Sequence, residues 1–400
     1  MEKRKLRILI VTLVFYNFGT KLQTYALCLT LKRLMDKDTD IQVLNTTSSW
    51  VGNASLLGNR GKTSKISFLI KLFKNYKLHS LKKLLEQRKW KKESLEIGNN
   101  QLNNEKTIKR KEKFKEIDSI IPYTKYYSHE EIRNDQSLSN YDIYIVGSDQ
   151  VWNFNKVLEQ DIYTLDFLEK KEKTYISYAA SFGVKKIPSY LTSFYKEKLK
   201  KFDSILVREV EGKNIISNLN LKSNLVLDPT LLLELKDYEE ITKKERIIKE
   251  PYVLVYSLNR SYKIYEEAQK ICNKYNLKLI VLKRSFCPPI ISEGNELYEI
   301  SPEDFLTLIK QSEITITNSY HAVIFSIIFH KPFFAFLDNM DDENSRITTL
   351  LNLLHLEKQI FYETNHIKVD NKIINYNLVD DILNSEKEKS IHLLKKSLHL

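Results

Sequence analysis

The sequence is poor in the residues that build several common kinds of site. It has nine glycines and three cysteines, Cys28, Cys272 and Cys287, among 400 residues. An odd number of widely spaced cysteines predicts neither a disulfide framework nor a zinc site, and it favours a reducing compartment. Neither GxGxxG nor GxxxxGK[ST] occurs, so the two common glycine-rich phosphate-binding loops are excluded. We expect no metal ion and no bound cofactor.

Long apolar runs are missing too. Ile8–Phe15 follows a short basic stretch, as in a signal peptide, but no small-residue cleavage site comes after it. We expect the first buried strand of an α/β domain there. The apolar run Ala322–Leu337 is interrupted by a His-Lys-Pro sequence that ends at Pro332, whereas a membrane span needs ~20 apolar residues. The sequence therefore predicts a soluble, cytoplasmic protein.

Positive charge is concentrated in one segment. The net charge is +12, and Arg60–Lys115 holds 18 Lys and Arg against 5 Asp and Glu, which leaves the rest of the chain about neutral. One interpretation is a solvated helical excursion. The other is a basic surface that contacts a lipid leaflet or a charged glycan, at the inner face of the cytoplasmic membrane. Nucleic acid is not predicted as a partner, because aromatic residues are not interleaved with the positive charges.

The rest of the chain alternates strand-like and helix-like segments. Leu6–Leu13 is apolar and β-branched, Lys21–Leu34 has apolar residues at helical spacing, and Ile41–Leu44 is a second strand. Such βαβ units bind ligands beyond the carboxyl ends of their strands. The turn, in which a glycine is free to take positive φ, and the start of the helix supply the first candidate cleft residues: Asn17, Gly19 and Gln23.

A later strand, Tyr141–Val146, leads into a small, polar and acidic run, Gly147–Asn153. In an α/β fold this position is typical of a ligand cleft. Ser148 is a candidate contact, Asp149 could act as a general base, and Trp152 could carry a sugar ring on its face.

The segment Ile314–Phe336 has the most pronounced pattern. It begins with the β-branched run Ile314–Thr317, and a polar turn then leads into an apolar stretch long enough for a helix. Ser319 and His321 would lie at the helix N-terminus, where free N–H groups and the helix dipole favour an anion. The simpler interpretation is an N-cap serine and a core histidine.

Two arginines lie at similar places. Arg208 follows a strand-like run, and Arg346 opens a predicted helix, from which it could reach an anion in the cleft. The charged stretch Lys236–Pro251 is the best linker candidate. We expect two domains, residues 1–240 with the basic helical insert 60–115, and residues 250–400 with helices at the C-terminus.

These motifs resemble the polysaccharide pyruvyl transferase family. The resemblance rests on short sequences in the family's order from Asn17 to about Leu356: NFG with LQ and YAL, VGSDQVWN, SYAASFG, VRE, VLDPT, PEDF, TNSYH with FS and KPF, and NSR. It implies two Rossmann-like α/β domains around a cleft, as in GT-B glycosyltransferases. It also implies transfer of pyruvate from phosphoenolpyruvate to a sugar of a capsule, an exopolysaccharide or a lipid-linked oligosaccharide precursor.

The resemblance assigns roles to the candidates, with the donor bound by the C-terminal domain. His321 would contact the donor phosphate and deliver a proton, and Asp149 would be the base on the acceptor side. The remaining donor-binding residues would be Ser319, Arg208, Arg346, Asn17 and Gly19. The acceptor-binding residues would be Trp152, Gln23 and Ser148. The chain departs from the family's TDSFHG sequence, since Asn318 and Ala322 replace its Asp and Gly.

Two other functions fit the same pattern. A GT-B glycosyltransferase that uses a nucleotide sugar would employ Asp149 and Trp152 equally well. A glycan-binding protein without catalytic activity would need Trp152 and the basic insert, but neither His321 nor the two arginines.

Overall fold

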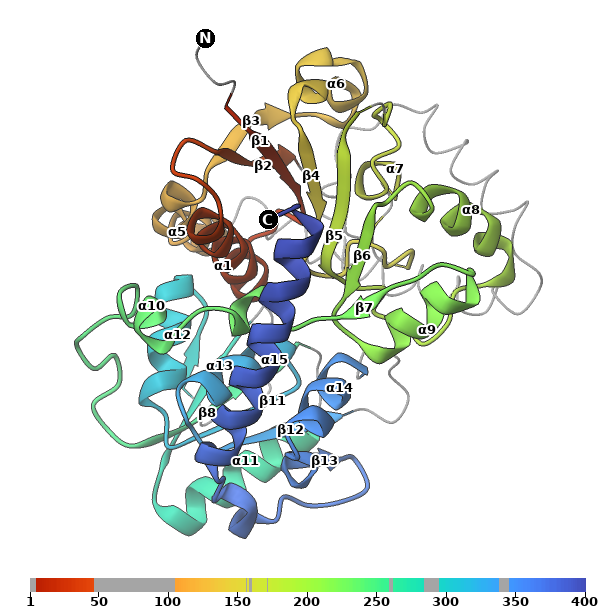
Figure 1. Cartoon of the computed structure of the whole chain (residues 1–400). Coiled ribbons are helices and arrows are strands. Elements are labelled where there is room, and N and C mark those ends of the chain that lie inside the picture. The colour runs from red at the N-terminus through yellow and green to blue at the C-terminus, as the bar shows by residue number, and fades with distance from the viewer. Residues whose placement is uncertain are drawn as a thin grey trace, which may run out of the picture.

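This computed structural model describes residues 5–46, 105–155, 157, 160–170, 172–258, 262–283, 295–337 and 345–400. Within them the chain forms two α/β domains, one above the other in Figure 1, each built around its own parallel sheet. The predicted fold class is therefore confirmed. Most of the basic insert 60–115 lies outside the described residues, and only positions 105–115 can be compared with the prediction.

The first sheet has seven strands in the order β3-β2-β1-β4-β5-β6-β7, and all neighbouring pairs are parallel. The strands are β1 (Arg7–Val11), β2 (Asp40–Thr46), β3 (Tyr123–Tyr127), β4 (Ile143–Val146), β5 (Thr174–Ala180), β6 (Ser204–Val207) and β7 (Asn224–Leu225). The central strands are apolar and buried, as in sheets covered on both faces. The strand order changes direction between β1 and β4. Open α/β sheets bind ligands at such a point, beyond the carboxyl ends of the strands.

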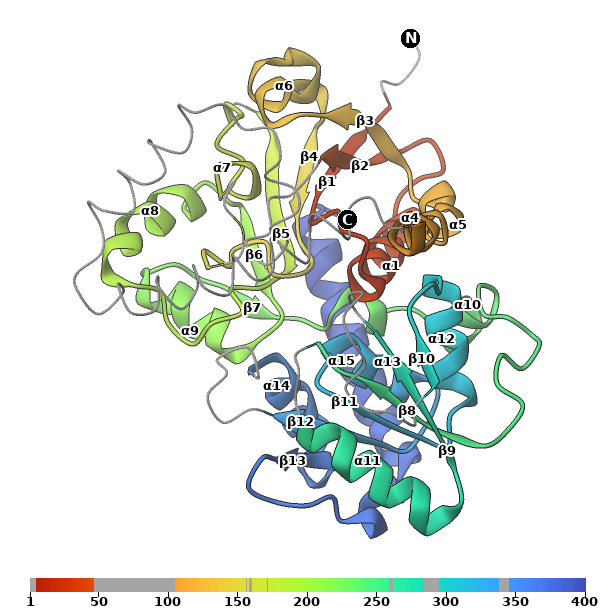
Figure 2. The ribbon, with the colours of Figure 1, turned by 180° about the vertical axis from the view of Figure 1, so that it is seen from behind.

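Helices flank this sheet on both faces (Figures 1 and 2). They are α1 (Phe18–Leu34), α4 (Glu105–Glu112), α5 (Lys115–Ile120), α6 (His129–Asn134), α7 (Gln160–Tyr163), α8 (Ser189–Leu199) and α9 (Val210–Asn218). The N-cap of α1 is Asn17, whose side chain accepts a hydrogen bond from Thr20 N. The helix contacts α12 (Pro302–Gln311) of the second domain and the 3-10 helix η3 (Pro229–Leu231).

The second sheet has six strands in the order β10-β9-β8-β11-β12-β13, again with parallel neighbours. The strands are β8 (Tyr252–Tyr256), β9 (Lys278–Leu282), β10 (Asn295–Leu297), β11 (Ile314–Thr317), β12 (Phe333–Leu337) and β13 (Ile360–Tyr362). Its helices, besides α12, are α10 (Leu235–Glu239), α11 (Tyr262–Tyr275), α13 (Tyr320–Ile328), α14 (Ser345–Leu353) and α15 (Tyr376–Ser397). The predicted strand–turn–helix at Ile314–Phe336 is present as β11 followed by α13.

The C-terminal helix α15 connects the two domains. It runs from the second domain back along the first, as Figure 1 shows in dark blue. Leu227 N donates to Ser390 Oγ at 3.0 Å, and Ser397 Oγ donates to Ser204 Oγ at 2.7 Å. The domain boundary near residues 240–250 stays a prediction.

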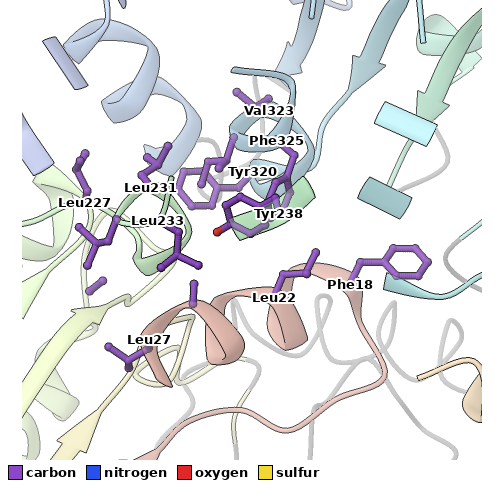
Figure 3. Packing of buried hydrophobic residues seen from close by; sticks show 14 of the residues in the cluster. Phe18, Leu22, Leu27, Leu227, Leu231, Leu233, Tyr238, Tyr320, Val323 and Phe325 are labelled. Carbon is purple, nitrogen blue, oxygen red and sulfur yellow. The ribbon is translucent and has the colours of Figure 1, made fainter. Parts of the chain in front are cut away.

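One hydrophobic cluster continues from the first domain into the second. It joins Phe18 and Leu22 of α1 to Phe305 of α12 and to Tyr320 and Phe325 of α13, and part of it is drawn in Figure 3. The rings of Phe18 and Phe305 stack with centroids 4.8 Å apart. This continuous apolar contact fixes how α1 and α13 approach each other. Among the described residues, no helix has both the length and the apolar character that a membrane span requires.

Candidate functional site

Polar residues of both domains meet where α1 and α13 begin. The first domain contributes the start of α1, the run after β4 and Arg208 after β6. The second domain contributes the turn after β11 and Arg346 in the first turn of α14. The strand ends that the sequence singled out therefore lie around one place between the domains.

His321 occupies the first turn of α13 and faces α1. Ser319 is the N-cap of α13, and its Oγ accepts a hydrogen bond from Ala322 N at 3.4 Å. The His321 side chain lies against Gly19, because a Cβ added to Gly19 would come within 3.0 Å of the imidazole ring. Gly19 is part of α1, so its role is to allow this approach and not to adopt positive φ in a turn, as the sequence had suggested.

The Nε2 atom of His321 is buried and has no hydrogen-bond partner among the described residues. It lies 3.9 Å from Asp228 Oδ2, too far for a direct hydrogen bond. Burial lowers the pKa of His321 below its usual value, and it outweighs the opposing attraction of Asp228 and Asp149. The imidazole is therefore mostly neutral at neutral pH and is held close to a carboxylate.

Arg208 is fully enclosed and shared between two carboxylates. Its guanidinium donates to Asp228 Oδ2 at 2.7 Å and to Asp149 Oδ1 at 3.2 Å. Burial by itself would raise the pKa of Asp228, but the attraction of His321 and Arg208 holds it below its usual value. In this conformation Arg208 organises the carboxylates, and its predicted contact with a donor anion stays a prediction.

Asp149 does not fit the role of general base. Its Oδ2 accepts a hydrogen bond from Thr20 Oγ1 at 2.9 Å, and its Oδ1 accepts bonds from Arg208 and from Gln150 N. Although burial acts to raise the pKa of Asp149, the nearby positive groups hold it at about 2. A carboxylate with so low a pKa is a weak base. We therefore correct this assignment to a structural one.

Arg346 reaches across to the first domain. With the side-chain amide of Gln150 turned so that its oxygen faces the guanidinium, that oxygen accepts from both terminal nitrogens of Arg346, at 2.9 and 3.0 Å. The ring of Tyr320 contacts both arginines, with its centroid 4.9 Å from the Arg208 Cζ and 5.7 Å from the Arg346 Cζ. Two cations and a histidine thus gather around the first turn of α13.

The three predicted acceptor residues are not available to an acceptor. Trp152 is fully buried, donates from Nε1 to Tyr163 O at 2.9 Å and packs on Phe182. Gln23 is buried in α1, where its amide donates to neighbouring oxygens. Ser148 is buried and donates to Asp228 Oδ2 at 3.1 Å. The prediction of a sugar platform at Trp152 is therefore wrong, because that ring is part of the core.

The two predicted donor residues nearest the helix starts act mainly as caps. Asn17 caps α1 and Ser319 caps α13, so each side chain satisfies one N–H group of its helix. Their further contact with a donor stays a prediction. Both helix N-termini nevertheless direct their positive ends toward the His321–Gly19 contact.

Sequence reasoning missed two buried carboxylates. Asp228 lies beside both His321 and Arg208, and it could have been found from its place after an apolar run in the VLDPT sequence. Glu209 accepts hydrogen bonds from Phe182 N and Gly183 N, and burial raises its pKa. Among the described residues, no group of three or more His, Cys, Asp or Glu is placed to hold a metal ion.

Comparison with known proteins gives one family and one fold. A family model for polysaccharide pyruvyl transferase matches residues 60–339, which is 280 of the 400 residues. Of the predicted site residues, Asn17, Gly19, Gln23 and Arg346 lie outside this match. No curated protein sequence matches the chain.

Solved structures with the same fold include UDP-GlcNAc 2-epimerase from Neisseria meningitidis bound to UDP-GlcNAc. That likeness has 10% identity and a TM-score of 0.50, and it covers 98% of this chain and 99% of the other. The S. aureus MnaA–UDP structure has 10% identity and a TM-score of 0.51 over 99% and 97% of the two chains. At this identity the likeness establishes the GT-B-like fold alone.

Proposed function

The chain belongs to the polysaccharide pyruvyl transferase family, and we propose that it transfers pyruvate from phosphoenolpyruvate to a sugar of a cell-surface polysaccharide or of its lipid-linked precursor. The observation that supports this proposal most is the gathering of His321, Arg208 and Arg346 at the first turn of α13. The donor carries a phosphate and a carboxylate. A helix N-terminus and arginine side chains are the groups that recognise both.

Donor binding would take place beside the His321–Gly19 contact, at the N-termini of α1 and α13. Arg346 can present a planar fork of N–H groups to the carboxylate or phosphate once it leaves Gln150. A bound anion would also oppose the effect of burial on His321 and raise its pKa. We therefore propose that the donor and a proton bind together, so that His321 becomes charged when the donor arrives.

The proposed chemistry begins with proton transfer from the His321 imidazolium to C3 of the enol, which leaves C2 cationic. One sugar hydroxyl then bonds to C2, the bond from C2 to the phosphate oxygen breaks, and a second hydroxyl closes a ketal. The two hydroxyl groups release two protons. One returns to His321, and the other leaves on the phosphate, which with a second pKa of about 6 is a stronger base than Asp149.

Asp228 has a positioning role in this scheme. Its carboxylate lies 3.9 Å from His321 Nε2 and favours the charged form of the imidazole. Arg208 and Ser148 hold the same carboxylate oxygen. His321 therefore lies next to the buried ion pair of Arg208 and Asp228.

For the acceptor, we propose a sugar of a lipid-linked oligosaccharide, approached by a peripheral contact of the basic segment 60–115 with an anionic membrane. The described end of that segment carries exposed lysines at positions 106, 109, 113 and 115. Replacing lysines of 60–115 by glutamine should weaken binding to vesicles that contain anionic lipid, and more at low salt than at high salt. Binding that is unchanged at every ionic strength would make this segment a solvated surface.

The experiment that tests the function combines purified protein, phosphoenolpyruvate and a lipid-linked or capsular oligosaccharide. We expect release of inorganic phosphate together with a pyruvylated acceptor detected by mass spectrometry. Parallel reactions with UDP-sugars test the alternative of a GT-B glycosyltransferase, whose fold this chain shares. Glycosyl transfer without pyruvylation would overturn the proposal.

A further inference from the structure

Helix α4 of the first domain contacts the second domain through a buried arginine. Arg110 on this helix is 5% exposed, and its guanidinium donates to Tyr298 O at 2.6 Å and to Lys283 O at 3.3 Å. Both carbonyls belong to the second domain, after β10 and β9. Thr107, one turn earlier on α4, has its hydroxyl 3.3 Å from the Tyr298 hydroxyl. Arg110 is thus a buried tie between the domains.

The same guanidinium packs on aromatic rings that lead to the site. Its Cζ lies 4.8 Å from the ring centroid of Phe18 and 4.9 Å from that of Tyr298. Phe18 is itself stacked between two rings, Phe114 at 5.6 Å and Phe305 at 4.8 Å. Arg110 therefore holds Phe18 from one side by cation–π contact while both domains hold it by stacking.

Phe18 is joined by one peptide bond to Gly19, the residue that lies against His321. No space separates Gly19 from the imidazole, since a Cβ on Gly19 would overlap the ring. A displacement of Phe18 would therefore change the spacing between α1 and His321. Packed interiors transmit such displacements because they deform little.

We propose that Arg110 is a positioning residue, which acts through Phe18 and Gly19 to hold His321 in its working place between the domains. This inference rests on the proposed function for its kinetic consequence. Its structural part, the spacing of α1 from His321, does not depend on which reaction the protein catalyses. Lysine cannot replace Arg110 fully, because its compact ammonium group lacks the planar guanidinium that contacts the Phe18 and Tyr298 rings while it donates to the carbonyls.

The first test measures kinetics of Arg110→Lys and Arg110→Ala with phosphoenolpyruvate and the oligosaccharide acceptor. A misplacement of about 1 Å far from the chemistry can cost roughly 100-fold in rate. We expect kcat of Arg110→Ala to fall about 10-fold to 100-fold with KM for the donor changed less, and Arg110→Lys to recover part of the loss. The control is Lys222→Ala, which removes an exposed positive charge of the first domain outside the segment 60–115 and should leave both constants unchanged.

The second test reads His321 directly and does not need the reaction. NMR titration of histidine resonances, with His321→Ala to identify the signal, gives the pKa of His321 in the full chain. His321 faces Asp228, Asp149, Arg208 and Arg346, and none of these is altered in the Arg110 variants. If α1 moves away and water reaches the ring, the pKa of His321 should rise toward the ordinary value in Arg110→Ala but not in Lys222→Ala.

The outcomes separate the two proposals. A wild-type protein that does not use phosphoenolpyruvate, but whose His321 signal responds to Arg110→Ala, would contradict the function and support the positioning role. An unchanged kcat together with an unchanged His321 pKa would overturn the positioning role. If Arg110→Ala does not fold, Arg110→Lys and Phe18→Leu carry the same measurements, since both keep a side chain of similar bulk.

Discussion

Two strand–turn–helix units meet at the site, β1 with α1 from the first domain and β11 with α13 from the second. Both helices begin on a capping side chain, Asn17 in one and Ser319 in the other. The second helical position is a glycine, Gly19, in α1 and a histidine, His321, in α13. A Cβ atom added at Gly19 would overlap the His321 ring. One unit supplies the reactive group and the other supplies the space for it.

The first helical position shows the same division. Phe18 of α1 stacks on Phe305 and Phe114 and fixes the contact between the domains. Tyr320 of α13 contacts the guanidinium groups of both Arg208 and Arg346. Two units of similar local structure therefore serve packing in one domain and charge organisation in the other. Local structure alone does not distinguish these roles; the residues that each helix start contacts do.

The largest effect is expected from removing the reactive group. His321→Ala should lower turnover by 10²–10⁴-fold, or roughly 3–5 kcal/mol of barrier, because a positioned proton donor is lost. The free energy of unfolding should change by no more than about 1–2 kcal/mol. Phosphate release and urea unfolding measure the two quantities.

The matched control for this prediction is His330→Ala. His330 follows α13, is exposed and interacts with Asp380 at 3.0 Å, away from the site. Its variant should keep full activity. If His321→Ala were unstable but fully active, His321 would be a core histidine. The α13 unit would then supply no reactive group.

The sequence was sufficient to predict the buried strands and the start of α13, whereas α1 begins at Phe18, three residues before the predicted Lys21. The β-branched run Ile314–Thr317, followed by polar residues and an apolar stretch, indicated a helix N-terminus at Ser319 and His321, and α13 is there. Apolar periodicity likewise located β1 and α1. Such patterns depend on neighbours in sequence, so they can be read without the rest of the fold.

Contacts between distant segments were not predictable in this way. Trp152 was expected to face a sugar because it follows a polar run, yet its ring packs on Phe182, 30 positions later. Asp149 was expected to be a general base, but it accepts hydrogen bonds from Arg208 and Thr20, and its low pKa makes it a weak base. The sequence places Asp228 after an apolar run, but only the folded chain shows that it lies near His321. Burial and ion pairing, which decide these roles, are properties of the tertiary structure.

A smaller effect should follow from filling the space in α1. In Gly19→Ala the new methyl group overlaps the His321 ring, and overpacking of this kind costs about 1–3 kcal/mol. Alanine is the better helix former by about 1 kcal/mol, which offsets part of this cost. We expect a net loss of stability and of activity in the single variant.

The double variant Gly19→Ala/His321→Ala sharpens this prediction. With the imidazole removed, the methyl group has room, so Gly19→Ala should no longer destabilise the protein. Denaturant unfolding of all four proteins gives the interaction energy, expected at about 0.5–3 kcal/mol for residues in contact. Additive losses would mean that Gly19 and His321 do not touch in solution.

The two caps should differ in activity more than in stability. Asn17→Ala and Ser319→Ala each remove one cap and should cost about 1 kcal/mol or less, because both capping bonds are long, at 3.3 and 3.4 Å. Ser319→Ala should also lower kcat, since it loosens the turn that carries His321, whereas Asn17→Ala should not. Ser319→Thr keeps a capping hydroxyl and should restore activity. Equal kinetic losses in Asn17→Ala and Ser319→Ala would contradict the division of roles.

The smallest expected effect is a pH dependence of stability that belongs to His321 alone. Burial lowers the pKa of this histidine in the folded protein below the value of 6.5 expected when unfolded. Between those two values the unfolded state binds more protons, so the wild-type protein should lose stability relative to His321→Ala as the pH falls through 6.5. For one proton, the free energy of unfolding cannot change by more than about 1.4 kcal/mol per pH unit.

Urea unfolding of the wild-type protein and of His321→Ala from pH 8 to 5.5 measures this difference, in which the contributions of the other histidines cancel. A wild-type protein that instead gains relative stability on acidification would show that Asp228 keeps His321 charged before any donor binds.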